Sequence, residues 1–308
     1  MSRKVFVAGH RGLVGSALVR RLSRESDVEV LVRARAEVDL TDRRAVDELF
    51  AKERPDEVYL AAAKVGGILA NDTLSGDFIR DNLLIQTHVI DAAHRFEATK
   101  LCFLGSSCIY PKLAPQPIRE ESLLTGPLEP TNDAYAVAKI AGIQMVRAYK
   151  KQFGMHAISV MPTNLYGPND NFDLQKSHVL PALIRKFHEA KVSGAPTVTV
   201  WGTGTPRREL LHVDDLADAC VFLMDRYDSP EPINVGVGDD VTIRELAELV
   251  RDVVGFGGDI TFDRSKPDGT PRKVLDVGRI HALGWKASIP LREGIASTYR
   301  WFVEHATS

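Results

Sequence analysis

The 308-residue chain is poor in cysteine, in charge of one sign and in long apolar runs. Its three cysteines, Cys102, Cys108 and Cys220, are odd in number and lack the spacing of a metal site, so we predict reduced thiols, no bound metal and a cytoplasmic location. Basic and acidic side chains nearly balance, 39 against 41, so no bulk field favours nucleic acid as a partner. No stretch approaches the ~20 apolar residues that cross a membrane, and the first residues lack the apolar core of a signal peptide.

What the chain does have is a regular alternation of short apolar runs and helical patterns in its first half. Strand patterns lie at 4–9, 28–33, 57–62, 100–107 and 156–168, and helix patterns lie at 14–25, 42–53, 82–96 and 134–153. Parallel strands need long crossovers, which helices supply, so this order predicts an α/β fold with a Rossmann-type, doubly wound parallel sheet. The pattern changes near residue 168. We expect an NADP-binding domain over 1–168, to which 208–225 return, and a smaller mixed α/β substrate lobe over 169–308.

Gly9, Gly12 and Gly15 follow the first strand in a G-x-x-G-x-x-G spacing. Glycine at these positions permits a tight turn and lets a pyrophosphate approach the backbone at a helix N-terminus. Glycines also serve ordinary turns, but the place of this loop at the first strand–helix junction favours dinucleotide binding.

Arginines near the expected ribose position favour NADP over NAD as the dinucleotide. Arg11 lies inside the glycine loop, and Arg33 and Arg35 follow the second strand. An arginine at the end of that strand accommodates a 2′-phosphate, although surface arginines end many strands. Asp39 and Leu40, in the next loop, are candidates to contact the adenine.

Tyr135 and Lys139 are four residues apart and therefore lie on one face of a predicted helix. A tyrosine with a pKa near ~10 transfers protons poorly at neutral pH unless a neighbouring cation lowers that pKa, and Lys139 supplies the cation. Ser106 or Ser107, at the end of the preceding strand, can hydrogen-bond a carbonyl that is being reduced. Such Tyr-Lys pairs also arise by chance on helices. The position of this pair, after the serines and the glycine loop, favours a catalytic set.

With these motifs the chain resembles the extended short-chain dehydrogenase/reductase family. A narrower similarity, to the 3,5-epimerase-4-reductases of that family, lies in blocks at 61–68, 105–112, 129–142, 160–172, 177–190, 200–217 and 265–277. The resemblance implies an enzyme that inverts C3 and C5 of GDP-4-keto-6-deoxy-D-mannose and reduces C4 with NADPH to give GDP-L-fucose. It also implies a homodimer.

The implied chemistry needs more than a reductase. A proton next to a ketone is removable only if the enolate oxygen is stabilised, which Tyr135 and Ser106 can do, and inversion needs a base and an acid on opposite faces. By resemblance these are Cys108 and His178, for which the ordinary alternatives are a loop filler and a polar helix cap. In an extended segment residues i and i+2 share a face, so we expect Ser106 and Cys108 to address one sugar ring and Ser107 to point away.

The remaining site residues form two groups. Cofactor contacts are expected at Gly9, Arg11, Gly12, Leu13, Val14, Gly15, Arg35, Asp39, Leu40, Ala62, Ala63, Leu104, Gly105, Lys139, Pro162, Asn164, Leu165 and His178. GDP-sugar contacts are expected at Ser107, Asn164, Lys186, Trp201, Arg208, Asp268 and Lys273. The family often has arginine where this chain has Lys186, which loses bidentate phosphate geometry; Arg207 is expected to compensate.

Two alternative functions remain at this point. One is a relative that acts on another GDP-keto sugar, such as a heptose, and only reduces or only epimerises it. The other is a non-catalytic NADP-binding regulator. The complete set of Ser106, Cys108, Tyr135, Lys139 and His178 argues against both.

Overall fold

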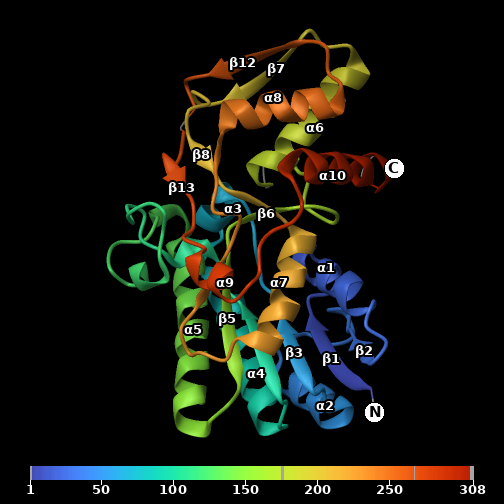
Figure 1. Cartoon of the computed structure of the whole chain (residues 1–308), viewed down its shortest axis with the longest axis vertical. Helices are drawn as coiled ribbons and strands as arrows, with labels where there is room; N and C mark the ends of the chain where they lie inside the picture. Colours follow the sequence, from blue (N-terminus) through green and yellow to red (C-terminus); the bar gives the residue numbers. More distant parts are fainter. Residues whose placement is uncertain (1, 175–176, 267, 306–308) are drawn as a thin grey trace.

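A six-stranded parallel sheet lies at the centre of the first domain (Figure 1). In a computed structural model, which describes residues 2–174, 177–266 and 268–305, the strand order is β10-β5-β4-β3-β1-β2. The strands are β1 (Arg3–Ala8), β2 (Val28–Leu31), β3 (Glu57–Leu60), β4 (Lys100–Leu104), β5 (Ala157–Pro162) and β10 (Ile233–Val235). The central strands are apolar and fully buried because helices cover both faces. The predicted Rossmann-type sheet is confirmed.

The helices of this domain form two layers. One layer pairs α1 (Leu13–Leu22) with α7 (Val213–Arg226). In the other layer α4 (Ser75–Arg95) packs between α2 (Arg43–Glu53) and α5 (Asp133–Phe153). Helices cover both faces of the sheet. A ligand can therefore reach the sheet at the edge where the carboxyl ends of the parallel strands lie.

The second lobe has a hydrophobic core of its own, at the top of Figure 1. Its helices are α6 (Val179–Ser193), α8 (Ile243–Val254) and α10 (Leu291–His305). Its sheets pair β7 (Thr197–Trp201) with β12 (Asp259–Asp263), and β8 (Arg207–Arg208) with β11 (Val241–Thr242) and β13 (Arg272–Lys273). Thr242 and Glu245 form a capping box that starts α8, and Gly255 ends it at φ +73°.

Short elements connect these parts. They are β6 (Asn164–Tyr166), which pairs with β9 (Leu210–His212), the helices α3 (Ile68–Thr73) and α9 (Gly278–Ala282), and the 3-10 turns η1 (Ser107–Ile109), η2 (Glu120–Ser122) and η3 (Pro130–Asn132). The predicted strand 156–168 is therefore two strands, which separate at Thr163 where its N–H donates to the Val235 carbonyl. The predicted strand 100–107 ends at Leu104.

The chain returns to the first domain over a longer stretch than 208–225. After α7 it adds β10, which pairs with β5 at the edge of the sheet. The return therefore runs to Val235. The sequence does not indicate to which sheet a short apolar strand such as "INV" belongs, because it could pair with a strand of either lobe.

Candidate active site

The glycine loop has the backbone that a dinucleotide requires. Gly9 has φ +85°, and a Cβ there would lie 2.8 Å from the Ala62 backbone. A Cβ on Gly15 would lie 2.1 Å from the Gly9 carbonyl oxygen. Gly12 is the N-cap of α1, and neither a capping side chain nor an acid in the first turn competes for its N–H groups. These residues fit a pyrophosphate.

The three arginines of the expected 2′-phosphate site do not act alike. Arg33 forms an ion pair with Glu53 at 2.6 Å and is held by it. The Arg35 side chain is 80% exposed and lies 3.6 Å from Asp39, and Arg11 is also exposed. Arg11 and Arg35 are therefore the cations that the structure presents beside the loop.

Residues expected on the nicotinamide side come from the ends of neighbouring strands. Ala62 and Ala63 follow β3, Leu104 and Gly105 end β4, and Pro162, Asn164 and Leu165 lie at the junction of β5 and β6. A Cβ at Gly105 would lie 2.1 Å from the Met161 side chain, so this junction is tightly packed. The sheet brings these positions to one edge, as parallel topology requires.

Lys139 and Tyr135 lie close together but do not interact as expected. The Lys139 ammonium donates to the Leu104 carbonyl at 2.7 Å and lies 5.9 Å from the centre of the Tyr135 ring. Burial lowers the pKa of Lys139 to about 8. Burial and the nearby Cys108 sulfur raise the pKa of Tyr135, and a hydrogen bond with Ser106 offsets this only in part. The expected lowering of the Tyr135 pKa by Lys139 is absent from this arrangement, so the phenol stays protonated at neutral pH.

Ser106 and Cys108 are joined by a helix-cap bond, and the expectation of an extended segment is wrong. Ser106 is extended, but Ser107–Ile109 coil into η1, whose N-cap is Ser106. The Ser106 hydroxyl oxygen accepts from the Cys108 N–H at 3.2 Å. Ser107 is buried, whereas Cys108 is half-buried and its sulfur lies 3.6 Å from the Lys273 ammonium.

His178 stands at the N-cap of α6, yet its side chain makes no capping hydrogen bond. The polar-cap alternative is therefore not realised. Although solvent reaches the ring, the surrounding protein and the Lys273 charge hold the pKa of His178 below its ordinary value, which favours the neutral imidazole. Lys273 thus contacts the Cys108 sulfur and lowers the pKa of His178, the two residues to which the resemblance assigns proton exchange.

At the expected GDP end, two cations lie close to an exposed indole. Trp201 is 57% exposed, and the ammonium groups of Lys186 and Lys266 lie 5.2 and 5.4 Å from its ring centre. The Lys186 ammonium also donates to the Thr199 carbonyl at 3.3 Å, and burial lowers the pKa of this lysine. Sequence reasoning missed Lys266, although it lies two residues before Asp268 in a block that was identified.

Arg207 does not compensate for Lys186, contrary to expectation. Its guanidinium pairs with the buried Asp240 carboxylate and donates to the Asp240 carbonyl at 2.8 Å. Arg208, on the same short strand, is half-buried, and burial lowers its pKa. Both carboxylate oxygens of Asp268 accept from Thr203, so Asp268 holds the loop after Trp201.

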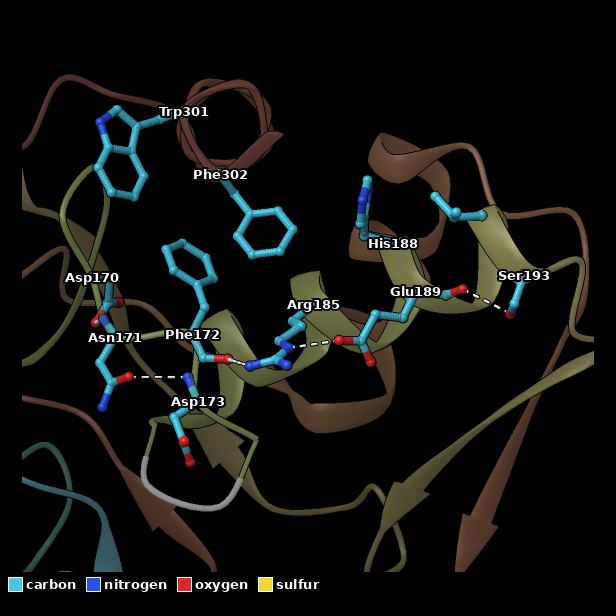
Figure 2. A pocket seen from close by; sticks show the side chains of 11 residues that line it. Asp170, Asn171, Phe172, Asp173, Arg185, His188, Glu189, Ser193, Trp301 and Phe302 are labelled. Atoms are coloured by element: carbon cyan, nitrogen blue, oxygen red, sulfur yellow. Dashed lines mark hydrogen bonds and ion pairs between the residues drawn. The ribbon is translucent and has the colours of Figure 1, made fainter. Parts of the chain in front are cut away.

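A separate cavity of about 630 Å³ lies between α6, α10 and the loop after β6 (Figure 2). Phe172 and Trp301 line it, as does the Arg185–Glu189 ion pair. Burial raises the pKa of Asp170, at its edge, to about 7. No residue of the expected site lines this cavity, so it is distinct from the catalytic set.

The described ranges, 2–174, 177–266 and 268–305, contain neither a membrane span nor a metal centre. No helix there is both long and apolar enough to cross a bilayer. No group of three or more His, Cys, Asp or Glu side chains there is arranged to hold a metal ion.

A strand–glycine loop–helix unit and a Ser-Tyr-Lys set on one parallel sheet define a dinucleotide-dependent class of enzyme. A model described as the NAD dependent epimerase/dehydratase family matches residues 5–236, and the chain belongs to this family. It is similar to the probable GDP-L-fucose synthase 1 of Oryza sativa subsp. japonica, with 63% identity over 306 residues that cover 99% of this chain and 93% of the relative.

Two solved structures are similar along almost their whole length. One is a GDP-L-fucose synthetase from Naegleria fowleri bound to NADP, with a TM-score of 0.93, 30% identity and coverage of 99% of this chain and 95% of that chain. The other is a GDP-6-OMe-4-keto-L-xylo-heptose reductase from C. jejuni, with a TM-score of 0.93, 37% identity and coverage of 98% of each chain. The expected fold and family are confirmed.

Proposed function

We infer that the protein is a bifunctional, NADP-dependent enzyme that epimerises GDP-4-keto-6-deoxy-D-mannose at C3 and C5 and reduces it at C4 to GDP-L-fucose. The observation that carries this inference is the cluster of Cys108 and Lys273 beside Tyr135. A ketone reductase needs the tyrosine and its lysine, but it has no use for a thiol and a neutral imidazole. The 63% identity to a GDP-L-fucose synthase supports the same substrate.

The chain's own residues account for each proton in this scheme. Ser106 and Tyr135 hydrogen-bond the C4 oxygen and stabilise the enolate that forms when C3 or C5 loses its proton. Cys108 and His178 remove and return those protons from opposite faces of the ring. Tyr135, protonated at neutral pH, then donates to the C4 oxygen as the ketone is reduced.

The glycine loop, Arg11 and Arg35 would hold the dinucleotide, and Lys139 would contact its ribose. When bound, NADPH supplies the hydride. The similarity to a synthetase bound to NADP supports this cofactor. Trp201, Lys186 and Arg208 would hold the GDP end of the substrate, with Lys266 as a second cation near the indole.

One observation favours a second candidate, a reductase of GDP-keto heptoses, because a reductase of that type has a TM-score of 0.93 with this chain. The lower identity of 37% and the epimerisation residues favour the first candidate. We also propose that the enzyme works as a homodimer in the cytoplasm. The exposed apolar Val137 and Phe153 on α5 and the three free cysteines support these two points.

The decisive experiment separates epimerisation from reduction. Tyr135→Phe is expected to slow NADPH consumption by ~100-fold or more, because it removes the proton donor, and to slow deuterium exchange at C3 and C5 less. Cys108→Ser is expected to do the reverse: exchange falls, while GDP-4-keto-6-deoxy-L-galactose, already inverted at both carbons, is still reduced. Cys220→Ser, which changes a buried cysteine of α7, is the matched control and should leave both rates unchanged.

Mass spectrometry of the deuterated product and NADPH absorbance measure the two rates. Equal loss of both activities in Cys108→Ser would refute the division of roles. Turnover of a heptose ketone in preference to the 6-deoxy sugar would select the second candidate instead.

A further inference from the structure

The loop that carries Cys108 has little regular structure to hold it. Between β4 and α5, the regular structure of residues 105–132 consists of short 3-10 turns and an isolated β-bridge from Ile118 to Leu275. Tyr110, two residues after Cys108, is buried at 3% exposure, and its hydroxyl donates to the Asn234 side-chain oxygen at 2.6 Å. A buried phenol–amide bond therefore connects the Cys108 turn to strand β10.

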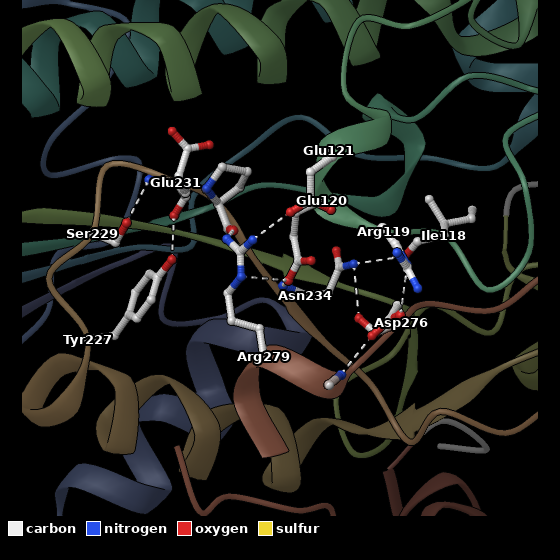
Figure 3. A network of polar contacts seen from close by, with 12 residues as sticks. Ile118, Arg119, Glu120, Glu121, Tyr227, Ser229, Glu231, Asn234, Asp276 and Arg279 are labelled. Carbon is white, nitrogen blue, oxygen red and sulfur yellow. Dashed lines mark hydrogen bonds and ion pairs between the residues drawn. The ribbon is translucent and has the colours of Figure 1, made fainter. Parts of the chain in front are cut away.

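Asn234 joins three segments through one side chain. It is completely buried, and its amide nitrogen donates to the carbonyls of Ile118 at 3.0 Å and Asp276 at 3.1 Å (Figure 3). Its oxygen accepts from Tyr110, so both N–H donors and one acceptor position are used. Its backbone N–H donates to the Glu120 carboxylate at 3.0 Å, which is the third bond between Asn234 and the loop at 105–132, after those to Tyr110 and Ile118.

The segment around Asp276 leads back to the site. Ile118 exchanges backbone hydrogen bonds with this segment: its N–H donates to Val274 and its carbonyl accepts from Asp276, both at 2.8 Å. The segment begins at Lys273, whose ammonium lies 3.6 Å from the Cys108 sulfur. Asn234 thus holds together the two stretches of chain whose side chains meet at the thiol.

The reduction residues are attached to the sheet by a different route. The Gly105 N–H, directly before Ser106, donates to the Val160 carbonyl at 2.8 Å. Lys139 is fixed to the end of β4 through Leu104. Neither contact is made with Asn234, so the reduction residues have a support of their own, although the hydrogen bond from the Cys108 N–H to Ser106 joins the two halves of the site.

We propose that Asn234 and Tyr110 are positioning residues for epimerisation, which hold the Cys108 sulfur in place against the sugar ring without touching it. This rests on the proposed function. Losing the amide donors takes the Asn234 partner from the Asp276 carbonyl and leaves the Ile118 carbonyl with the Asp276 N–H alone, so the loop is held less firmly. A displacement of ~1 Å at an aligned acid–base group can cost up to ~100-fold in rate.

The test compares three conservative variants of the full chain. Tyr110→Phe removes only the hydroxyl, and Asn234→Asp keeps size and acceptor but removes both donors. Tyr227→Phe is the matched control, because its hydroxyl donates to the Glu231 carbonyl at 2.9 Å in the same region and reaches the Cys108 loop indirectly, through Arg279, which pairs with Glu120 and Glu121 (Figure 3).

We expect deuterium exchange at C3 and C5 to fall about tenfold or more in Tyr110→Phe and further in Asn234→Asp, while reduction of GDP-4-keto-6-deoxy-L-galactose stays within about twofold of the unmodified protein. The rate at which iodoacetamide alkylates Cys108, measured by peptide mass spectrometry, should differ from that of the unmodified protein in Tyr110→Phe and Asn234→Asp. Tyr227→Phe should match the unmodified protein in all three measurements.

Equal loss of exchange and reduction would overturn the proposal, because it would indicate a general structural role. Unchanged exchange in Tyr110→Phe would also overturn it. If Asn234→Asp does not fold, Tyr110→Phe decides. If the unmodified protein neither exchanges nor reduces the sugar, the proposed function fails first, and iodoacetamide reactivity still tests the placement of the thiol.

Discussion

At the scale of single residues, burial sets the protonation of the proposed reduction pair. Lys139 is 4% exposed, and its ammonium has a carbonyl partner at 2.7 Å. Desolvation penalises the charged form, so it lowers the pKa of the lysine and raises that of Tyr135. The two shifts leave a protonated phenol beside an amine that titrates near physiological pH.

A pH profile follows from this pair. Below about 8 Lys139 is an ammonium and above it a neutral amine, whereas Tyr135 stays protonated throughout. Because Lys139 is proposed to hold the cofactor ribose and a charged ammonium donates stronger hydrogen bonds than a neutral amine, kcat/KM for reduction of GDP-4-keto-6-deoxy-L-galactose should fall as pH rises through about 8. Steady-state kinetics from pH 6 to 10 measure it. Lys139→Met should be slow at every pH, and a flat profile for the unmodified protein would contradict the assignment.

Residue identities were more predictable than residue placement. The Ser106, Cys108, Tyr135 and Lys139 positions could be chosen from spacing and from resemblance. The cap bond between Ser106 and Cys108 could not be predicted, because three residues coil or extend according to contacts made elsewhere. The role of Asn234 could not be predicted from the sequence, because its partners Asp276 and Tyr110 lie 42 and 124 residues away in the chain.

At the scale of elements, patterns predicted the buried strands and long helices well. The run "KVFVA" of β1 and the amphipathic face of α5 suffice to define them. Two-residue strands such as β8 and β13 carry no such pattern, and only tertiary pairing creates them. The ion pair of Arg207 with Asp240 follows from the pairing of β8 with β11, which Asp240 directly precedes, and the sequence alone therefore wrongly predicts that Arg207 faces the substrate.

The outer face of α5 gives a prediction at this scale. Val137 is 45% exposed on the helix that carries Tyr135, and burying such a side chain against a second copy is worth ~1.5–3 kcal/mol. Val137→Glu should therefore weaken a homodimer, because the charge would have to be desolvated. Sedimentation velocity should show the 34.0 kDa monomer for the variant and twice that mass for the unmodified chain. A monomeric unmodified chain would refute the dimer, and Val192→Glu on α6 is the control with a similar exposed valine.

At the scale of the molecule, the first domain is assembled from distant parts of the chain. Residues 3–166 supply five strands of the central sheet and the β6 strand, and β9, α7 and β10 return after the chain has begun the second lobe. The β6–β9 pair marks the crossing between the lobes. The first domain therefore combines 1–168 with a returning stretch, as expected, and that stretch extends past residue 225 to include β10.

The fragment 1–168 should consequently fail to fold alone. It lacks α7, whose Leu216, Cys220 and Leu223 are fully buried against α1 and the sheet, and it leaves β5 without β10. At ~1.5–3 kcal/mol for each large apolar side chain exposed, this loss approaches the whole stability of a domain, about 5–15 kcal/mol.

Circular dichroism on heating should show no cooperative transition for 1–168, and NADPH should not bind. Joining 1–168 to 208–238 through a flexible linker should restore both, because that stretch supplies β9, α7 and β10. A cooperative transition in 1–168 alone would contradict this prediction, because it would show that the first domain folds without the returning segment.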